Sequence, residues 1–195
     1  MVVGSPVPRS ARPTPTDAFR LARRTWLRGD RLDMSALASE LGIGRVTLYR
    51  WFGSREQLLV EVVWSAADRL LRQVDEQVDE QAGSVGSERV VAVVGGFLEG
   101  VIASPAMRAW IDHEGEAVMR LLTRRQPGFQ PRLTAAIAAL LERERSRGQW
   151  ELPAEVSEVA YVIVRLIESY TYLDLITGET PDAERAMPIL RMLLR

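Results

Sequence analysis

Residues 33–52 read DMSALASELGIGRVTLYRWF and predict two short helices joined by a glycine turn. Asp33 is a good N-cap for a first helix over about 34–41. Gly42 can take the left-handed conformation that ends a helix. A second helix then follows over about 45–52. This arrangement is a helix-turn-helix, and it says more about function than the rest of the chain.

The second helix carries side chains that suit DNA recognition. Helical spacing turns Leu48 and Phe52 inward. The opposite side then presents Arg45, Val46, Tyr49 and Arg50. A short helix of this size and chemistry fits the DNA major groove.

The charge of the chain is divided between its two ends. Residues 1–55 hold ten arginines and four acidic residues, a net charge of +6, whereas residues 56–195 hold 15 arginines and 22 acidic residues, a net charge of −7. A basic end on an acidic body suits a protein that touches a polyanion with one end only. The chain contains neither lysine nor asparagine. Base recognition would therefore depend on arginine, threonine, tyrosine or apolar contacts.

The composition argues against several other classes of protein. The chain has no cysteine and one histidine, so a thiolate nucleophile, a disulfide and a cysteine metal site are ruled out. No motif indicates a cofactor, and no pattern supports an enzyme on a helical scaffold. The longest apolar run, 90–98, is far short of the ~18–20 residues that span a bilayer. We expect a soluble cytoplasmic protein with no membrane partner.

Helical periodicity along the rest of the chain predicts an all-α fold of about nine helices. The expected regions are a disordered tail (1–13), a helix-turn-helix DNA-binding domain (14–53), a bridging helix (54–82) and a helical domain for effector binding and dimerisation (83–195). Beyond the bridging helix, the expected helices are 87–102, 105–112, 113–125, 131–147, 153–176 and 181–194.

Residues 33–59 resemble the DNA-binding signature of the TetR family of bacterial transcriptional regulators. The matching residues are Leu37-Ala38, Gly42-Ile43, Thr47-Leu48-Tyr49, Phe52 and Ser54-Arg55-Glu56-Gln57-Leu58-Leu59. The resemblance implies a homodimer that represses by binding a palindromic DNA operator and is released by a small apolar effector. By position it implies that Arg45 reaches base edges, and that Thr47 and Tyr49 contact phosphate or a thymine methyl group. Arg55 would contact phosphate.

Three positions depart from the family pattern. Gly44 stands where a serine or threonine cap is common, Val46 where a glycine, proline or alanine is frequent, and Trp51 where a histidine is common. The Trp51 indole could donate to a phosphate or pack against the first helix, which we expect to follow the N-cap Thr14 and to run to about Arg28. Arg50 has no fixed role in the family, but its charge suits a phosphate contact. The expected DNA-binding residues are Gly44, Arg45, Val46, Thr47, Tyr49, Arg50, Trp51 and Arg55.

The chain is also similar to the QsdR-type subgroup of the family. The supporting stretches are Leu48-Tyr49-Arg50-Trp51, Gly53-Ser54-Arg55-Glu56, Ser104-Pro105 and Leu121-Leu122-Thr123-Arg124-Arg125. This similarity implies a lactone-like or acyl-chain effector.

Helix 153–176 carries a polar and aromatic stripe formed by Tyr161, Arg165, Glu168 and Tyr172. These residues could supply the polar groups of a ligand pocket. Alternatively, Arg165 and Glu168 pair while the tyrosines lie at a subunit interface. Together with 181–194, this helix is the expected dimerisation surface. The expected effector-binding residues are Trp64, Phe97, Trp110, Met119, Tyr161, Arg165, Glu168 and Tyr172.

A second possibility is a DNA-binding regulator whose C-terminal domain binds a protein partner instead of a small molecule. An enclosed cavity in that domain would favour the small molecule, whereas a filled core would favour the protein partner.

Overall fold

The computed structural model describes residues 12–80, 85–123, 128–147 and 150–195. All regular structure in these ranges is helical, with no strand among them, which confirms the predicted all-α fold. The predicted tail lies outside the described residues up to residue 11. Within the described ranges, no one helix combines the length and apolar composition that crossing a membrane requires, although α5 and α6 meet that test when joined across a 61° bend. The helices are α1 (Pro15–Leu27), α2 (Met34–Glu40), α3 (Arg45–Phe52), α4 (Arg55–Glu80), α5 (Ser87–Ile102), α6 (Pro105–Thr123), α7 (Phe129–Arg147), α8 (Val156–Thr171), α9 (Leu173–Thr177), the 3₁₀ turn η1 (Glu184–Ala186) and α10 (Met187–Leu193).

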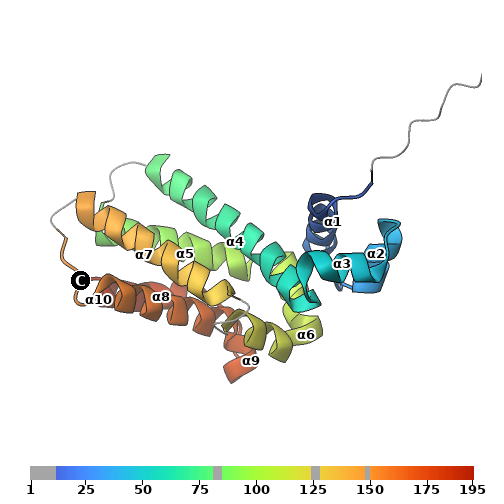
Figure 1. Ribbon diagram of the computed structural model, residues 1–195. Coiled ribbons are helices and arrows are strands. Elements are labelled where there is room, and N and C mark those ends of the chain that lie inside the picture. The colour runs from blue at the N-terminus through green and yellow to red at the C-terminus, as the bar shows by residue number, and fades with distance from the viewer. Residues whose placement is uncertain (1–11, 81–84, 124–127, 148–149) are drawn as a thin grey trace, which may run out of the picture.

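Helices α1–α3 form a small unit at one end of the molecule (Figure 1). Thr14 and Asp17 cap α1 reciprocally, each side chain accepting a hydrogen bond from the other residue's backbone N–H. At the start of α2, Asp33 Oδ1 accepts from the N–H groups of Ala36 (2.7 Å) and Ser35 (2.9 Å). These two bonds hold the pKa of Asp33 below its usual value. Local capping chemistry therefore fixes where both helices begin.

Helix α4 leads from this unit into the body, where α5, α7, α8 and α10 lie together (Figure 1). Leu58, Leu59, Val62 and Val63 line its buried face. One hydrophobic cluster runs from α1 through α4 into the C-terminal helices. Helix α4 therefore packs against both the α1–α3 unit and the body, so a displacement of α4 would change its contacts with both.

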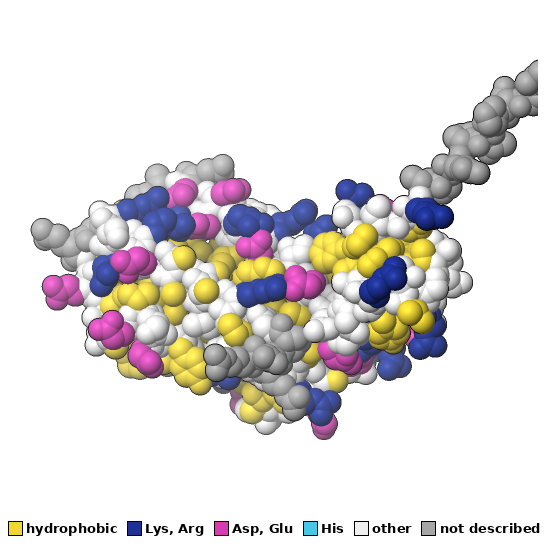
Figure 2. All heavy atoms as spheres, viewed as in Figure 1, with side chains coloured by type: hydrophobic (Ala, Val, Ile, Leu, Met, Phe, Trp, Pro, Cys, Tyr) yellow, Lys and Arg dark blue, Asp and Glu magenta, His cyan; other side chains and the backbone are white. Residues whose placement is uncertain are grey.

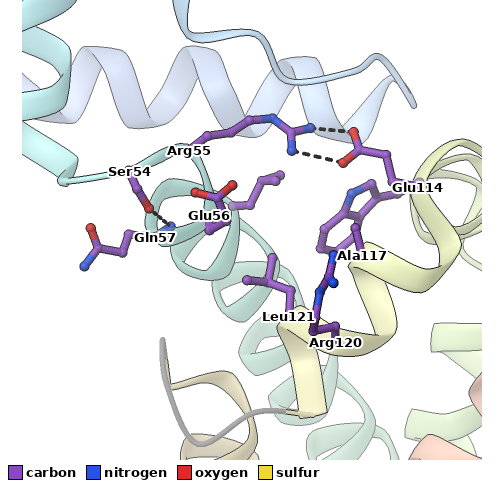
Figure 3. A pocket seen from close by; sticks show the side chains of 10 residues that line it. Ser54, Arg55, Glu56, Gln57, Glu114, Ala117, Arg120 and Leu121 are labelled. Carbon is purple, nitrogen blue, oxygen red and sulfur yellow. Dashed lines mark hydrogen bonds and ion pairs between the residues drawn. The ribbon is translucent and has the colours of Figure 1, made fainter.

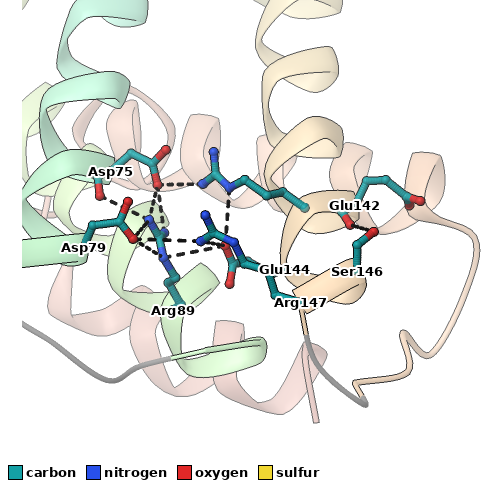
Figure 4. Close-up of polar contacts among 8 residues, drawn as sticks. Asp75, Asp79, Arg89, Glu142, Glu144, Ser146 and Arg147 are labelled. Carbon is teal, nitrogen blue, oxygen red and sulfur yellow. Dashed lines mark hydrogen bonds and ion pairs between the residues drawn. The ribbon is translucent and has the colours of Figure 1, made fainter.

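The end of α4 is joined to α5 and α7 by a cluster of ion pairs (Figure 4). Arg89 is 2% exposed, and its guanidinium donates to Asp75 Oδ1 at 2.8 Å and to Asp79 Oδ1 at 2.6 Å. The fully buried Glu144 lies 3.6 Å from Arg89 Nε, and Arg143 pairs with both Asp75 and Glu144. Burying these charges is tolerated only because each faces an opposite charge.

The segment predicted as one helix over 153–176 is divided in the structure. Helix α8 ends at Thr171, Tyr172 leaves the helical conformation, and α9 follows. Arg108 of α6 supplies the reason, since it donates to the Thr171 carbonyl at 3.0 Å and to Asp174 Oδ2 at 3.0 Å. A cation at this point satisfies the end of α8 in place of a further turn.

Two other predicted helix boundaries differ from the structure. The last helix was expected from residue 181, but α10 begins at Met187 after η1. Pro188 lacks an N–H and is favoured in the first turn of a helix, which explains that start. The helices expected over 105–112 and 113–125 form one helix, α6, which ends at Thr123 and has a non-helical residue at Glu114 (φ −139°), while residues 124 and 125 lie outside the described residues.

Candidate DNA-binding surface and internal cavity

Helix α3 buries one residue and exposes most of the others. Leu48 is fully buried, whereas Val46 is 81% exposed and Tyr49 is 38% exposed. Arg45 and Arg50 are also exposed, and Thr47 is half-buried. Gly44 is the N-cap residue and provides no side-chain hydrogen bond to the helix, so the first N–H groups of α3 are not capped by it. The exposed side of α3 thus carries hydrogen-bond donors that can meet a polyanion.

The surface around α3 is rich in arginine. Figure 2 shows arginine side chains over the α1–α3 end, while the body mixes both signs of charge. Two of the four acidic residues in this part of the chain, Asp17 and Asp33, are engaged in capping helices. The exposed arginines among the described residues of this end are Arg12, Arg20, Arg24, Arg28, Arg31, Arg45 and Arg50. Such a surface attracts phosphate groups, and its affinity for them falls with salt.

Trp51 lies at the junction of α3 and α4. Its half-buried ring packs against the hydrophobic core, and it lines a shallow recess with Phe52, Gln57 and Glu61. The ring is thus held partly by packing. A phosphate contact by its N–H stays a prediction.

Arg55, which we expected to contact phosphate, has protein partners in the structure (Figure 3). Its Nη1 and Nη2 donate to the two carboxylate oxygens of Glu114, at 3.0 Å and 2.5 Å, and its Nε donates to the Leu32 carbonyl at 2.7 Å. Arg31 Nε lies 3.4 Å from the same carboxylate. Glu114 is the non-helical residue of α6. The bend in α6 is thereby tied to the start of α4 and to the loop before α2.

A cavity of about 230 Å³ lies between α1 and the helices of the body. Its walls come from α1, α4, α5, α6, α7 and α8, and most of the lining is apolar. The residues that line it are Trp26, Leu27, Val63, Ala66, Ala67, Leu70, Phe97, Gly100, Val101, Ser104, Met107, Leu122, Phe129, Leu133, Ile167, Glu168, Thr171 and Tyr172.

Three of the eight expected effector-binding residues line this cavity, namely Phe97, Glu168 and Tyr172. Burial raises the pKa of Glu168 to about 7 and also raises the pKa of Tyr172. Glu168 Oε1 is buried and has no hydrogen-bond partner within the described part of the chain. A buried polar atom of this kind costs free energy unless something satisfies it.

The other five expected residues lie elsewhere. The Trp64 ring packs edge-on against Phe129, with the ring centres 5.9 Å apart. Trp110 packs in the same way against Trp26 at 6.2 Å, and it also lines the cleft beside Arg55. The remaining residues are Met119, which is half-buried against the core, Tyr161, which is 47% exposed, and Arg165, which pairs with Glu168.

The polar stripe of α8 therefore divides between two environments. Tyr161 lies at the surface beneath the Arg165 guanidinium, whose carbon is 5.5 Å from the ring centre, while Glu168 and Tyr172 face the cavity. Sequence reasoning missed that Trp26 and Leu27 of α1 line the cavity, since Trp26 fits an ordinary core stripe equally well and nothing in the helical pattern singles out Leu27.

The family model described as "Bacterial regulatory proteins, tetR family" matches residues 29–62. The model described as "Tetracyclin repressor-like, C-terminal domain" matches residues 85–195, which is more than half of the chain. A comparison with curated protein sequences gives no match.

Solved structures agree with the family models. The transcriptional repressor QsdR of R. erythropolis, from the TetR family, is 28% identical with a TM-score of 0.82, over 92% of this chain and 93% of that one. A putative transcriptional regulator from Rhodococcus sp. RHA1 (20% identity, TM-score 0.64, 93% and 95% covered) shares the fold. So does the regulator FadR of Bacillus subtilis in complex with stearoyl-CoA (12% identity, TM-score 0.59, 93% and 97% covered). The chain belongs to the TetR family of DNA-binding bacterial transcriptional regulators, and it is not an enzyme.

Proposed function

We propose that the chain is a cytoplasmic homodimeric repressor that binds a palindromic operator through α3 and releases it when a small effector occupies the cavity. The observation that carries the proposal is the shared wall of the cavity. Trp26 and Leu27 belong to α1 of the DNA-binding unit, and they line the cavity together with helices of the body. A molecule in the cavity would touch both parts at once. The lining of the cavity, which is mainly apolar with a few polar groups, also supports a small molecule over a protein partner as the regulator.

The proposed contacts with DNA are those of α3 and its surroundings. Arg45 would reach base edges, with Thr47 and Tyr49 at phosphate or a thymine methyl group. Arg50 would contact phosphate. One short helix reads few base pairs, so two copies on a palindrome are needed for tight and specific binding.

The proposed dimer surface combines α8 with α10. Apolar side chains on these helices are exposed in the single chain, including Tyr161, Val162, Ile189 and Met192. An exposed apolar patch of this kind is typical of a protein interface. A second copy would cover it and would hold two α3 helices at a fixed separation.

The proposed switch links the cavity to the DNA-binding unit by two routes. An effector contacts α1 directly through Trp26, and it contacts α6 through Met107 and Leu122. Glu114 of α6 pairs with Arg55 at the start of α4, and Arg55 in turn donates to the Leu32 carbonyl, which lies between α1 and α2 of the DNA-binding unit. An effector that favours one arrangement of these helices weakens DNA binding, typically by ~1–3 kcal/mol, and DNA weakens effector binding equally.

The test has two stages. The purified chain is used to select its site from random DNA, and the affinity for that site is then measured with and without a panel of small apolar compounds. Ala66→Phe places a large ring where Ala66 lines the cavity, and Ala139→Phe on the exposed side of α7 is the matched control. We expect a palindromic site, at least one compound that weakens binding, and loss of that response in Ala66→Phe alone. Failure to enrich any sequence would refute DNA recognition, and an unchanged response in Ala66→Phe would refute the cavity as the effector site.

A further inference from the structure

Among the described residues, the cavity lining contains a single charged side chain. Of the 18 residues that line it, only Glu168 is ionisable as an acid or base near neutral pH, and no arginine from the described ranges is among them. The other polar lining residues are Ser104, Thr171 and Tyr172. The Thr171 hydroxyl already donates to the Ile167 carbonyl. Glu168 is therefore the group that decides which polar ligand atoms the cavity accepts.

Of the two carboxylate oxygens of Glu168, Oε2 is paired within the described ranges and Oε1 is not. Arg165, one turn earlier on α8, forms an ion pair with Oε2, and it is not among the residues that line the cavity. Oε1 is buried and, among the described residues, has no hydrogen-bond partner. The charge of the carboxylate is thus balanced from outside the cavity, while one of its oxygens lacks a partner.

This arrangement disfavours both kinds of charged ligand. An anionic headgroup would be buried beside the Glu168 carboxylate, and the described lining residues supply no cation to balance its charge. A cationic headgroup would add a positive charge to a pair that Arg165 has already neutralised, and the excess charge would be buried. An uncharged polar group meets neither penalty. Because burial raises the pKa of Glu168 to about 7, the group can accept a hydrogen bond as a carboxylate or donate one as an acid.

We propose that the cavity selects small, uncharged, mainly apolar molecules that carry one polar headgroup hydrogen-bonded to Glu168, and that it rejects carboxylates and ammonium ions of the same shape. The volume of about 230 Å³ lies at the small end for ligand pockets, which suits a short chain rather than a large cofactor conjugate. This inference rests on the proposed function, since it takes the cavity to be the effector site.

The test uses two matched pairs of probes with the same alkyl chain. Octanamide and octanoate differ by one negative charge, and 1-octanol and octylammonium differ by one positive charge. Each is titrated by calorimetry at pH 7 into the full-length chain without DNA. We expect octanamide and 1-octanol to bind at least roughly tenfold more tightly than their charged counterparts.

Two variants then assign the selectivity to Glu168. Glu168→Met keeps the length of the side chain and removes the hydrogen-bonding group, and Glu158→Met on the exposed first turn of α8 is the control. Glu168→Met should weaken the binding of 1-octanol and of octanamide by about tenfold, which corresponds to the loss of one hydrogen bond to a buried group. It should also reduce the difference in affinity between octanamide and octanoate. Glu158→Met should leave all four affinities unchanged. Retained binding in Glu168→Met, even if weaker, shows that the cavity is intact.

Several results would overturn the inference. These are a charged probe that binds as tightly as its neutral partner, no binding by any of the four probes, and an unchanged preference in Glu168→Met. A failure of the proposed function is distinguishable from a failure of this inference. The proposed function is tested by the release of selected DNA in the presence of a compound, whereas the four probes are titrated without DNA.

Discussion

Breaking the ion pair between Arg55 and Glu114 should loosen the connection between the DNA-binding unit and α6. The pair is bidentate, and its side chains are 23% and 11% exposed, so water screens it only partly. Fully buried pairs cost ~3–5 kcal/mol when one partner is removed, and exposed pairs contribute at most ~1 kcal/mol. An intermediate coupling of about 2 kcal/mol follows for this pair. The neighbouring Arg31 is 75% exposed and should contribute little.

A double-mutant cycle measures this coupling directly. Arg55→Met, Glu114→Met and the double variant are unfolded in urea at one fixed protein concentration, because dimerisation makes stability depend on concentration. The cycle cancels the bond from Arg55 to the Leu32 carbonyl, since that bond is lost equally with and without Glu114.

The exposed pair Arg28–Asp30, with side chains 59% and 57% exposed, is the control, and its expected coupling is about 0.3 kcal/mol. A coupling below ~0.5 kcal/mol between Arg55 and Glu114 would refute the view that this pair joins the two parts.

Three further predictions concern stability and binding. Arg89→Met should lower the free energy of unfolding by about 3 kcal/mol in a urea titration, because it removes the buried cation that donates hydrogen bonds to Asp75 and Asp79 and faces the buried Glu144; a loss below ~1 kcal/mol would contradict this. The folded-state pKa of Glu168, about 7, lies above its ordinary value of 4.5, so the folded state favours the protonated carboxyl group. The resulting contribution to the free energy of unfolding is fully present below pH 4.5 and is lost as the pH rises through 7. The melting temperature of Glu168→Met relative to wild type should therefore be higher at pH 8 than at pH 5, and an equal difference at both would contradict the assignment. Affinity for the selected DNA should fall steeply as salt rises, and a flat response would argue against phosphate contacts by the arginine-rich end.

Local signals in the sequence predicted much of the fold. The caps Thr14 and Asp33 and the inward position of Leu48 depend on neighbours within a few residues, and the structure confirms all three. The break at Tyr172 depends on Arg108, which donates to Thr171 from 63 residues away. No periodicity carries such information, so the helix was predicted to continue.

In the candidate site, too, the sequence predicts features that depend on local spacing and misses those that depend on contacts between distant residues. The exposure of Arg45 and Tyr49 follows from the helical repeat of α3 alone. The cavity requires six helices to converge, and of the expected lining only Phe97, Glu168 and Tyr172 reach it. Trp64 and Met119 were chosen for being large and apolar, a property that core residues share. Side-chain type and helical spacing therefore predicted the exposed side of α3 better than the lining of the cavity.

The central claim is that α3 reads the operator, and the affinity of α3 variants for the selected DNA tests it most directly. Fluorescence anisotropy is measured at one salt concentration for wild type, Arg45→Ala and Tyr49→Ala, with Arg145→Ala on the exposed end of α7 as the control. Size-exclusion chromatography shows whether each variant keeps its oligomeric state. We predict that both α3 substitutions weaken binding by at least about tenfold while the control binds as wild type does. Wild-type affinity in both α3 variants would contradict the claim.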